Sequence, residues 1–146
     1  MAEINEALEF YPLNIAVLTV SDTRDVESDT SGGTLVERAT TAGHVIVDRK
    51  IVKDEIVAIR EAVALWVADD GVDVVLTTGG TGFSPRDVTP EAIKPLFRRE
   101  MDGFSVVFHQ VSMGTVGIST LQSRAFAGQA GETFVFCMPG STGACR

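Results

Sequence analysis

An apolar run that ends in a glycine-rich bend constrains the fold of this chain more than any other stretch. Residues 72–76 are apolar except for Asp73, the pattern of a strand buried on both faces of a parallel sheet. The bend, 77–82, holds threonine hydroxyls and three glycines, which would leave backbone N–H groups open to an anion. Open α/β sheets bind ligands at the carboxyl ends of their strands. The stretch therefore predicts a phosphate site, with a plain strand-to-helix turn as the alternative.

A carboxylate lies close to this expected phosphate site. Asp87 follows the last glycine by five residues and could hold a metal ion against bound phosphate, or could form a solvated ion pair beside Arg86. Thr89 and Pro90 are typical N-cap and first-turn residues, and they predict a helix over residues 90–99. The bend is not a Walker loop, because no Lys-Ser/Thr pair follows its glycines. Their spacing also differs from the dinucleotide-binding fingerprint.

Apolar periodicity along the rest of the chain indicates an α/β fold. The predicted strands are 13–20, 44–52 and 72–76. The predicted helices are 32–41, one that starts at Asp54, has apolar positions from Ile56 to Val67 and stops at residues 69–71, and 90–99. A further apolar face spans 104–113, and 124–127 with 133–138 form a hairpin. Asp29 or Ser31 would cap the first of these helices. The alternation of strands and helices predicts a mostly parallel sheet with right-handed crossovers, to which the hairpin adds an antiparallel pair.

Composition and charge narrow the function. With 146 residues, 45% of them hydrophobic, the chain fits one domain around one core. A formal net charge of −8 argues against binding to nucleic acid or to an anionic membrane. An anionic ligand would then need backbone amides, a divalent cation, or one of Arg24, Arg86 and Arg124. Residues 1–11 carry three acids and no base, unlike a signal sequence, and no apolar run would span a bilayer, so we expect a cytoplasmic protein.

Several other chemistries find no support in the sequence. Cys137 and Cys145 lack CxxC spacing and the two histidines are isolated, so we expect reduced cysteines and no zinc site. No Ser-His-Asp arrangement or GxSxG turn supplies a nucleophile for acyl transfer.

Polar residues follow three of the predicted strands. If the strand order holds, Ser21-Asp22, the bend 77–82 and 139–141 meet at one carboxyl edge of the sheet. Asp54 ends a strand-to-helix connection that points to the same edge. Asp54 and Asp87 could therefore hold Mg²⁺ against the phosphates of a nucleotide, as nucleotidyl transfer requires. The alternative role for Asp54 is a helix N-cap.

Another polar pair precedes the predicted hairpin. Ser123 and Arg124 could clamp an anion, or could simply begin an edge strand.

The order of these motifs resembles the molybdopterin-binding family of molybdenum cofactor biosynthesis. The matching motifs are Leu18–Asp22, Asp29–Gly32, Thr77–Gly82 with Arg86–Pro90, and Pro139–Ser141. Ser119–Arg124 and Met138–Arg146 are similar to the MoaB branch of that family rather than to the MogA branch. Because the resemblance begins at Leu13, we expect residues 1–12 to be an N-terminal extension and 13–146 to be the molybdopterin-binding domain.

The resemblance implies both a structure and an activity. The structure is a three-layer α/β sandwich that forms homotrimers or homohexamers. The activity is an adenylyltransferase that moves AMP from Mg-ATP to molybdopterin and releases pyrophosphate. Asp54 and Asp87 would be the catalytic and magnesium-binding acids. The residues that would bind the nucleotide or the pterin are Ser21, Asp22, Asp29, Ser31, Gly32, Thr78, Gly79, Gly80, Thr81, Gly82, Ser123, Arg124, Pro139, Gly140 and Ser141.

The family resemblance also leaves alternatives. Family members usually continue into a closing C-terminal helix, which we expect to be missing here because the chain stops at Arg146. A non-catalytic oligomeric carrier of molybdopterin is the alternative function. A nucleotide hydrolase of related fold is a weaker one.

Overall fold

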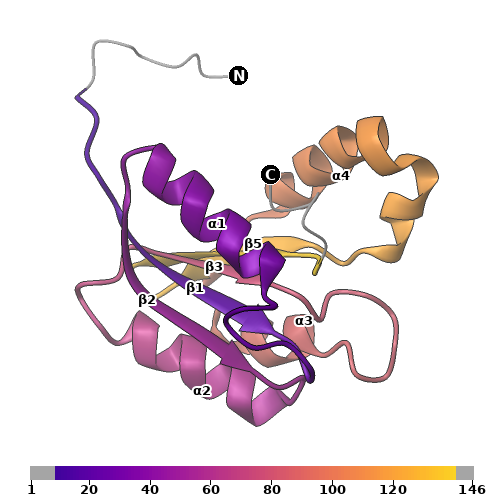
Figure 1. Cartoon of the computed structure of the whole chain (residues 1–146), viewed down its shortest axis with the longest axis horizontal. Coiled ribbons are helices and arrows are strands. Elements are labelled where there is room, and N and C mark those ends of the chain that lie inside the picture. Colours follow the sequence, from indigo (N-terminus) through magenta and orange to yellow (C-terminus); the bar gives the residue numbers. More distant parts are fainter. Residues whose placement is uncertain (1–8, 141–146) are drawn as a thin grey trace.

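The computed structural model describes residues 9–140, and within them six strands form one mixed sheet (Figure 1). The strands are β1 (Asn14–Val20), β2 (Val45–Val52), β3 (Val74–Thr78), β4 (Arg99–Glu100), β5 (Phe126–Ala130) and β6 (Thr133–Met138). Their order across the sheet is β2-β1-β3-β6-β5-β4. The pairs among β2, β1, β3 and β6 are parallel, whereas β5 pairs antiparallel with β6 and β4. The predicted parallel sheet with an antiparallel C-terminal pair is confirmed.

Helices cover both faces of this sheet (Figure 1). They are α1 (Thr30–Thr41), α2 (Ile56–Val67), α3 (Thr89–Ile93) and α4 (Asp102–Val116), with 3₁₀ turns η1 (Lys94–Leu96) and η2 (Gly117–Gln122). Because alternate residues of a strand point to opposite faces, Val17 of β1 packs in one core with α1, while its neighbour Leu18 packs in the other with α2 and α3. α4 lies on the α1 side, where Phe104 contacts Phe136 of β6 with ring centroids 5.5 Å apart. The three-layer arrangement is therefore confirmed.

The helix predicted over residues 90–99 is wrong beyond its first turn. α3 ends at Ile93, the chain continues as a short 3₁₀ turn, and Arg99 belongs to strand β4. Pro95 is the physical reason, because its nitrogen cannot donate the hydrogen bond that would extend the α-helix. The N-cap of α3 is Val88 rather than Thr89, whose hydroxyl instead donates to the carbonyl of Gly79 at 2.9 Å.

Other expectations fall partly outside the described residues. Cys137 is buried and free, and burial raises the pKa of its thiol to about 12, in keeping with a reduced cysteine. The described residues, 9–140, do not include Ser141, Cys145, or residues 1–8 of the expected N-terminal extension. The expectation that a closing C-terminal helix is missing also concerns residues beyond this range. Within the described part of the chain, no helix combines the length and hydropathy needed to cross a membrane.

Candidate functional site

A cavity of about 410 Å³ lies at the carboxyl edge of the sheet, where β1, β3 and β6 end side by side. The predicted site residues that line it are Ser21, Asp22, Asp29, Ser31, Asp54, Thr78, Gly79, Gly80, Thr81, Gly82, Asp87, Ser123, Pro139 and Gly140. Gly32 and Arg124 do not line it, and Ser141 lies outside the described residues. Sequence reasoning missed Thr19, Val20, Thr23 and Gln122, and named Arg24 only as a possible anion partner.

The glycine bend after β3 is held by its own hydrogen bonds. Gly79 and Gly80 have φ angles of +102° and +73°, a conformation that residues with a side chain rarely adopt. The bend lies against Val20 and Thr89, and the N–H of Gly79 donates to the carbonyl of Met138 at 3.0 Å. In residues 9–140, the next three N–H groups, of residues 80–82, meet no acceptor. Three successive donors at the rim of a cavity are well suited to binding an anion.

Asp87 is fixed beside this bend. Its Oδ2 accepts the N–H of Ser84 at 2.9 Å. A Cβ placed on Gly82 would lie 2.7 Å from the same oxygen, so the glycine leaves room for the carboxylate. The side chain is thus turned toward the glycine bend.

Arg124 acts on the loop that carries Asp87, and it does not line the cavity. Its Nε donates to the carbonyl of Gly82 at 2.9 Å and its Nη2 to the carbonyl of Asp87 at 2.7 Å. Its Nη1 contacts both carboxylate oxygens of Glu91 at 2.9 Å. The guanidinium therefore ties the two ends of residues 82–87 together, a different role from the anion clamp or edge-strand start considered from the sequence.

Asp54 reaches the same cavity from the opposite loop. α2 begins at Ile56 with Glu55 as its N-cap, so Asp54 does not cap the helix. Its backbone N–H donates to Asp22 Oδ1 at 3.1 Å. Partial burial, followed by the charges of Asp22 and Asp87, raises the pKa of Asp54 above its usual value. Asp22, Asp54 and Asp87 all line this cavity.

Asp22 is itself paired, which the sequence did not reveal. Both of its carboxylate oxygens accept hydrogen bonds from Arg86, at 2.8 and 3.1 Å, and these bonds lower the pKa of Asp22. The ion pair proposed for Arg86 is thus made with an acid 64 residues away rather than with its neighbour Asp87.

The donors fit a magnesium ion that arrives with a nucleotide. In residues 9–140, no group of three or more His, Cys, Asp or Glu side chains is arranged to hold a metal ion by itself. Magnesium is usually bound by one or two carboxylates together with substrate phosphates and water, rather than by an all-protein cage. Asp54 and Asp87 could supply the carboxylates, and the glycine bend could bind the phosphates.

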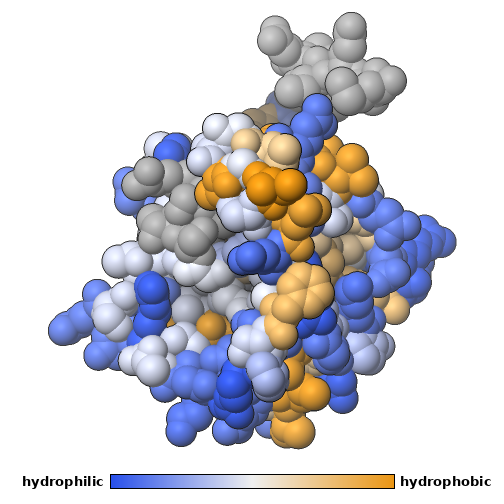
Figure 2. Space-filling view, turned by 90° about the vertical axis from the view of Figure 1, so that its right-hand side faces the viewer, coloured by the Kyte–Doolittle hydropathy of each residue, from blue (hydrophilic) through white to orange (hydrophobic). Residues whose placement is uncertain are grey.

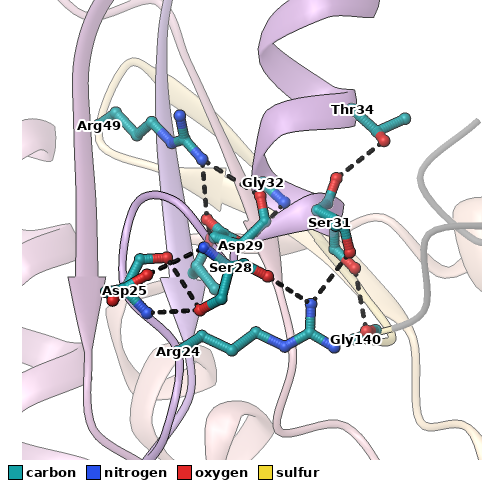
Figure 3. Close-up of polar contacts among 11 residues, drawn as sticks. Arg24, Asp25, Ser28, Asp29, Ser31, Gly32, Thr34, Arg49 and Gly140 are labelled. Carbon is teal, nitrogen blue, oxygen red and sulfur yellow. Dashed lines mark hydrogen bonds and ion pairs between the residues drawn. The ribbon is translucent and has the colours of Figure 1, made fainter.

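Asp29 is buried and fully engaged by the protein (Figure 3). One carboxylate oxygen caps α1 by accepting the N–H of Gly32 at 2.9 Å, and the other accepts from Thr19 at 2.6 Å and from Arg49 at 3.1 Å. A Cβ on Gly32 would overlap this carboxylate, which explains the glycine. Asp29 therefore shapes the cavity wall, whereas the hydroxyl of Ser31 is turned toward the C-terminal turn and donates to the carbonyl of Gly140 at 3.0 Å.

Replacing Asp54 by asparagine is expected to stabilise the metal-free protein at neutral pH. Far below the pKa of an exposed aspartate, Asp54 is protonated in both the folded and unfolded states and does not lower the free energy of unfolding. As pH rises through the raised folded pKa, Asp54 becomes charged in the folded state and lowers the free energy of unfolding. Asp54→Asn should raise Tm by about 1–2 °C at neutral pH, because solvent screens most of the repulsion. Thermal unfolding followed by circular dichroism should show this gain shrinking toward about pH 4; a lower Tm at neutral pH would contradict it.

Comparison with known proteins identifies the family and the fold of this chain. Residues 16–146 match the family described as "Probable molybdopterin binding domain". The chain is 55% identical over 138 residues to "Molybdenum cofactor biosynthesis protein B" of Escherichia coli K12, covering 94% of this chain and 81% of that protein. A crystal structure of a molybdenum cofactor biosynthesis protein B superposes with a TM-score of 0.89 at 43% identity, covering 93% and 85% of the two chains. A MogA structure superposes with a TM-score of 0.80 at 28% identity, covering 91% and 87%.

Proposed function

This chain belongs to the molybdopterin-binding family of molybdenum cofactor biosynthesis, of the MoaB and MogA type, and we propose that it transfers AMP from Mg-ATP to molybdopterin. One observation carries the proposal. Asp54 and Asp87 lie in the loops after β2 and β3, and both line a cavity beside the N–H groups of residues 80–82, which meet no acceptor within residues 9–140. This is the combination of carboxylates and backbone donors that nucleotidyl transfer needs.

In the proposed reaction, a phosphate oxygen of molybdopterin attacks the α-phosphorus of ATP. A new phosphoanhydride bond forms, the bond between the α- and β-phosphates breaks, and pyrophosphate leaves. Magnesium bound with the nucleotide would neutralise the charge that develops on the phosphates. Asp54 and Asp87 would hold and orient the Mg-nucleotide, and residues 80–82 would donate N–H groups to its phosphate oxygens. No residue has to form a covalent intermediate.

The test of this function is pyrophosphate release with purified protein, Mg-ATP and molybdopterin, together with detection of the adenylylated pterin. The proposal expects pyrophosphate only when molybdopterin is present. Pterin binding without pyrophosphate would favour the non-catalytic carrier. ATP consumption that does not depend on the pterin would favour a hydrolase. Either result would overturn the adenylyltransferase.

We also propose that copies of this chain assemble into trimers or hexamers through α4. No residue of α4 is buried in the single chain, and Val107 and Val111, one helical turn apart, are 58% and 70% exposed. Figure 2, which faces the side of the molecule that carries α4, shows apolar side chains gathered in a band. An exposed helix face of this kind is typical of a surface that pairs with a partner.

The double variant Val107→Asp/Val111→Asp is expected to reduce the mass measured by light scattering after gel filtration to that of a single chain, because the charges would be buried at the contact. The matched control is Leu65→Asp on α2, which places one charge at a residue that is 64% exposed on another element. That control should keep the wild-type mass. An unchanged mass in the double variant would place the contact elsewhere.

A further inference from the structure

The ion pair between Arg86 and Asp22 joins the loop that carries Asp87 to the loop after β1, which also contacts Asp54. Arg86 precedes Asp87 in the loop after β3, and Asp22 follows β1. The pair is bidentate, with Arg86 Nη2 2.8 Å from Asp22 Oδ1 and Nε 3.1 Å from Oδ2. Asp22 Oδ1 also accepts the backbone N–H of Asp54 at 3.1 Å. One carboxylate thus contacts both sides of the cavity mouth.

The charge around the cavity poses a problem for an anionic ligand. Among the described lining residues, four acids face one base: Asp22, Asp29, Asp54 and Asp87 against Arg24. Asp29 is neutralised internally by Arg49. A nucleoside triphosphate approaching the remaining three acids would be repelled, unless a metal ion and a nearby cation offset their charge.

Arg86 is the cation placed to supply this offset. Its side chain is 59% exposed and packs into no core, so it can change partner without unfolding anything. Arg86 does not itself line the cavity, but its guanidinium is bonded to Asp22, which does, so it already lies at the acidic side of the cavity mouth. A guanidinium forms the same two-pronged hydrogen bonds with phosphate as with carboxylate, and a polyphosphate carries more negative charge than Asp22.

We propose that Arg86 binds phosphate. It is paired with Asp22 in the free protein, and it exchanges the Asp22 carboxylate for the polyphosphate when the metal-nucleotide enters. Until then its guanidinium offsets the acids that would otherwise attract a metal ion alone. This inference rests on the proposed function. It adds Arg86 as a residue that binds the phosphates, and Asp22 as the residue that pairs with Arg86 before the nucleotide binds. It predicts opposite effects of one substitution on metal binding and on nucleotide binding.

The experiment measures binding rather than turnover. Free Mn²⁺ is followed by electron paramagnetic resonance, first with metal alone and then with an ATP analogue that has a methylene bridge between its α- and β-phosphates. Arg86→Gln should weaken binding of the Mn-analogue by roughly tenfold, because a charge-assisted bond to phosphate is lost. The same variant should tighten Mn²⁺ binding without nucleotide by roughly fivefold, because a competing cation is gone.

Three further variants separate partner exchange from general charge effects. Lys53→Gln removes the same charge beside Asp54 from an exposed side chain that forms no ion pair within the described residues, and should change neither affinity more than about twofold. Asp22→Asn frees Arg86 and should tighten analogue binding a few-fold. In the double variant Arg86→Gln/Asp22→Asn, that gain should disappear.

The outcomes distinguish a failure of the role of Arg86 from a failure of the proposed function. Equal analogue affinity for wild type and Arg86→Gln, Mn²⁺ affinity that is unchanged or unmeasurable in both, or independent effects in the double variant would overturn the role of Arg86 and leave the proposed function standing. A wild-type protein that binds no Mn-analogue at all would overturn both.

Discussion

Replacing Asp87 or Asp54 by alanine is expected to abolish AMP transfer while leaving the binding of molybdopterin largely intact. Both side chains line the cavity, and both are proposed to bind the metal of Mg-ATP rather than the pterin. Removing one carboxylate should lower kcat on the order of 10²–10⁴-fold, because charge neutralisation and positioning supply most of the rate in phosphate chemistry. Pyrophosphate release measures the first effect, and quenching of pterin fluorescence measures the second.

The matched control for these variants is Asp70→Ala. Asp70 is exposed and lies between α2 and β3, at the amino edge of the sheet and away from the cavity. The substitution removes the same charge and should leave pyrophosphate release within about twofold of wild type. Wild-type turnover in Asp87→Ala or Asp54→Ala would remove that residue from the proposed mechanism. An equal loss in Asp70→Ala would mean that net charge, rather than position, had been measured.

The parts of the site that follow from strand ends were predictable from the sequence. The apolar run of β3 and the glycines behind it mark a buried parallel strand and a bend at its carboxyl end. Because β1, β3 and β6 are neighbours in the sheet, the polar residues after each strand meet in one cavity. The same rule brought Asp54 to the cavity, since the connection from β2 to α2 leaves that edge.

The parts that depend on pairing between distant side chains were not predictable. Arg86 lies beside Asp87 in the sequence, yet its partner is Asp22. Arg124 was a candidate anion ligand, but its partners are Glu91 and the carbonyl groups of residues 82 and 87, and no sequence pattern distinguishes those carbonyls from any other backbone. The partner of Asp29 is Arg49 on β2, and nothing in the alternation of that strand singles it out. Apolar periodicity indicates which face of an element is buried, but it does not indicate which charged side chains form ion pairs.

One error had a visible signal. Pro95 stands in the middle of the helix predicted over residues 90–99, and proline there removes a hydrogen bond of the helix. Arg99, at the end of that predicted helix, instead pairs with Gln129 of β5 at the sheet edge. The site was unaffected, because α3 is needed only for its first turn, where Thr89 holds the carbonyl of Gly79.

Gly79→Ala is expected to lower the free energy of unfolding by about 3 kcal/mol or more and to disable the anion site. With φ at +102°, a side chain at this position is strained whatever space surrounds it. Its Cβ would also overlap the carbonyl oxygen of Val20, part of the central strand β1, so the clash cannot be relieved by turning a side chain. The glycine bend would have to move away from β1. Urea denaturation measures the loss, and binding of the Mn-analogue measures the damage to the site.

Gly103→Ala is the control for this explanation of the Gly79→Ala effect. It is the same substitution at a position where a Cβ meets no atom within 4 Å and φ is not positive. It lies in the first turn of α4, where alanine is tolerated at least as well as glycine, so unfolding should change by less than about 1 kcal/mol, toward greater stability. Similar midpoints for the two alanine variants would mean that the bend can relax. The glycines would then be needed for the ligand's approach to the backbone rather than for the fold, and Gly79→Ala should weaken binding of the Mn-analogue without affecting stability.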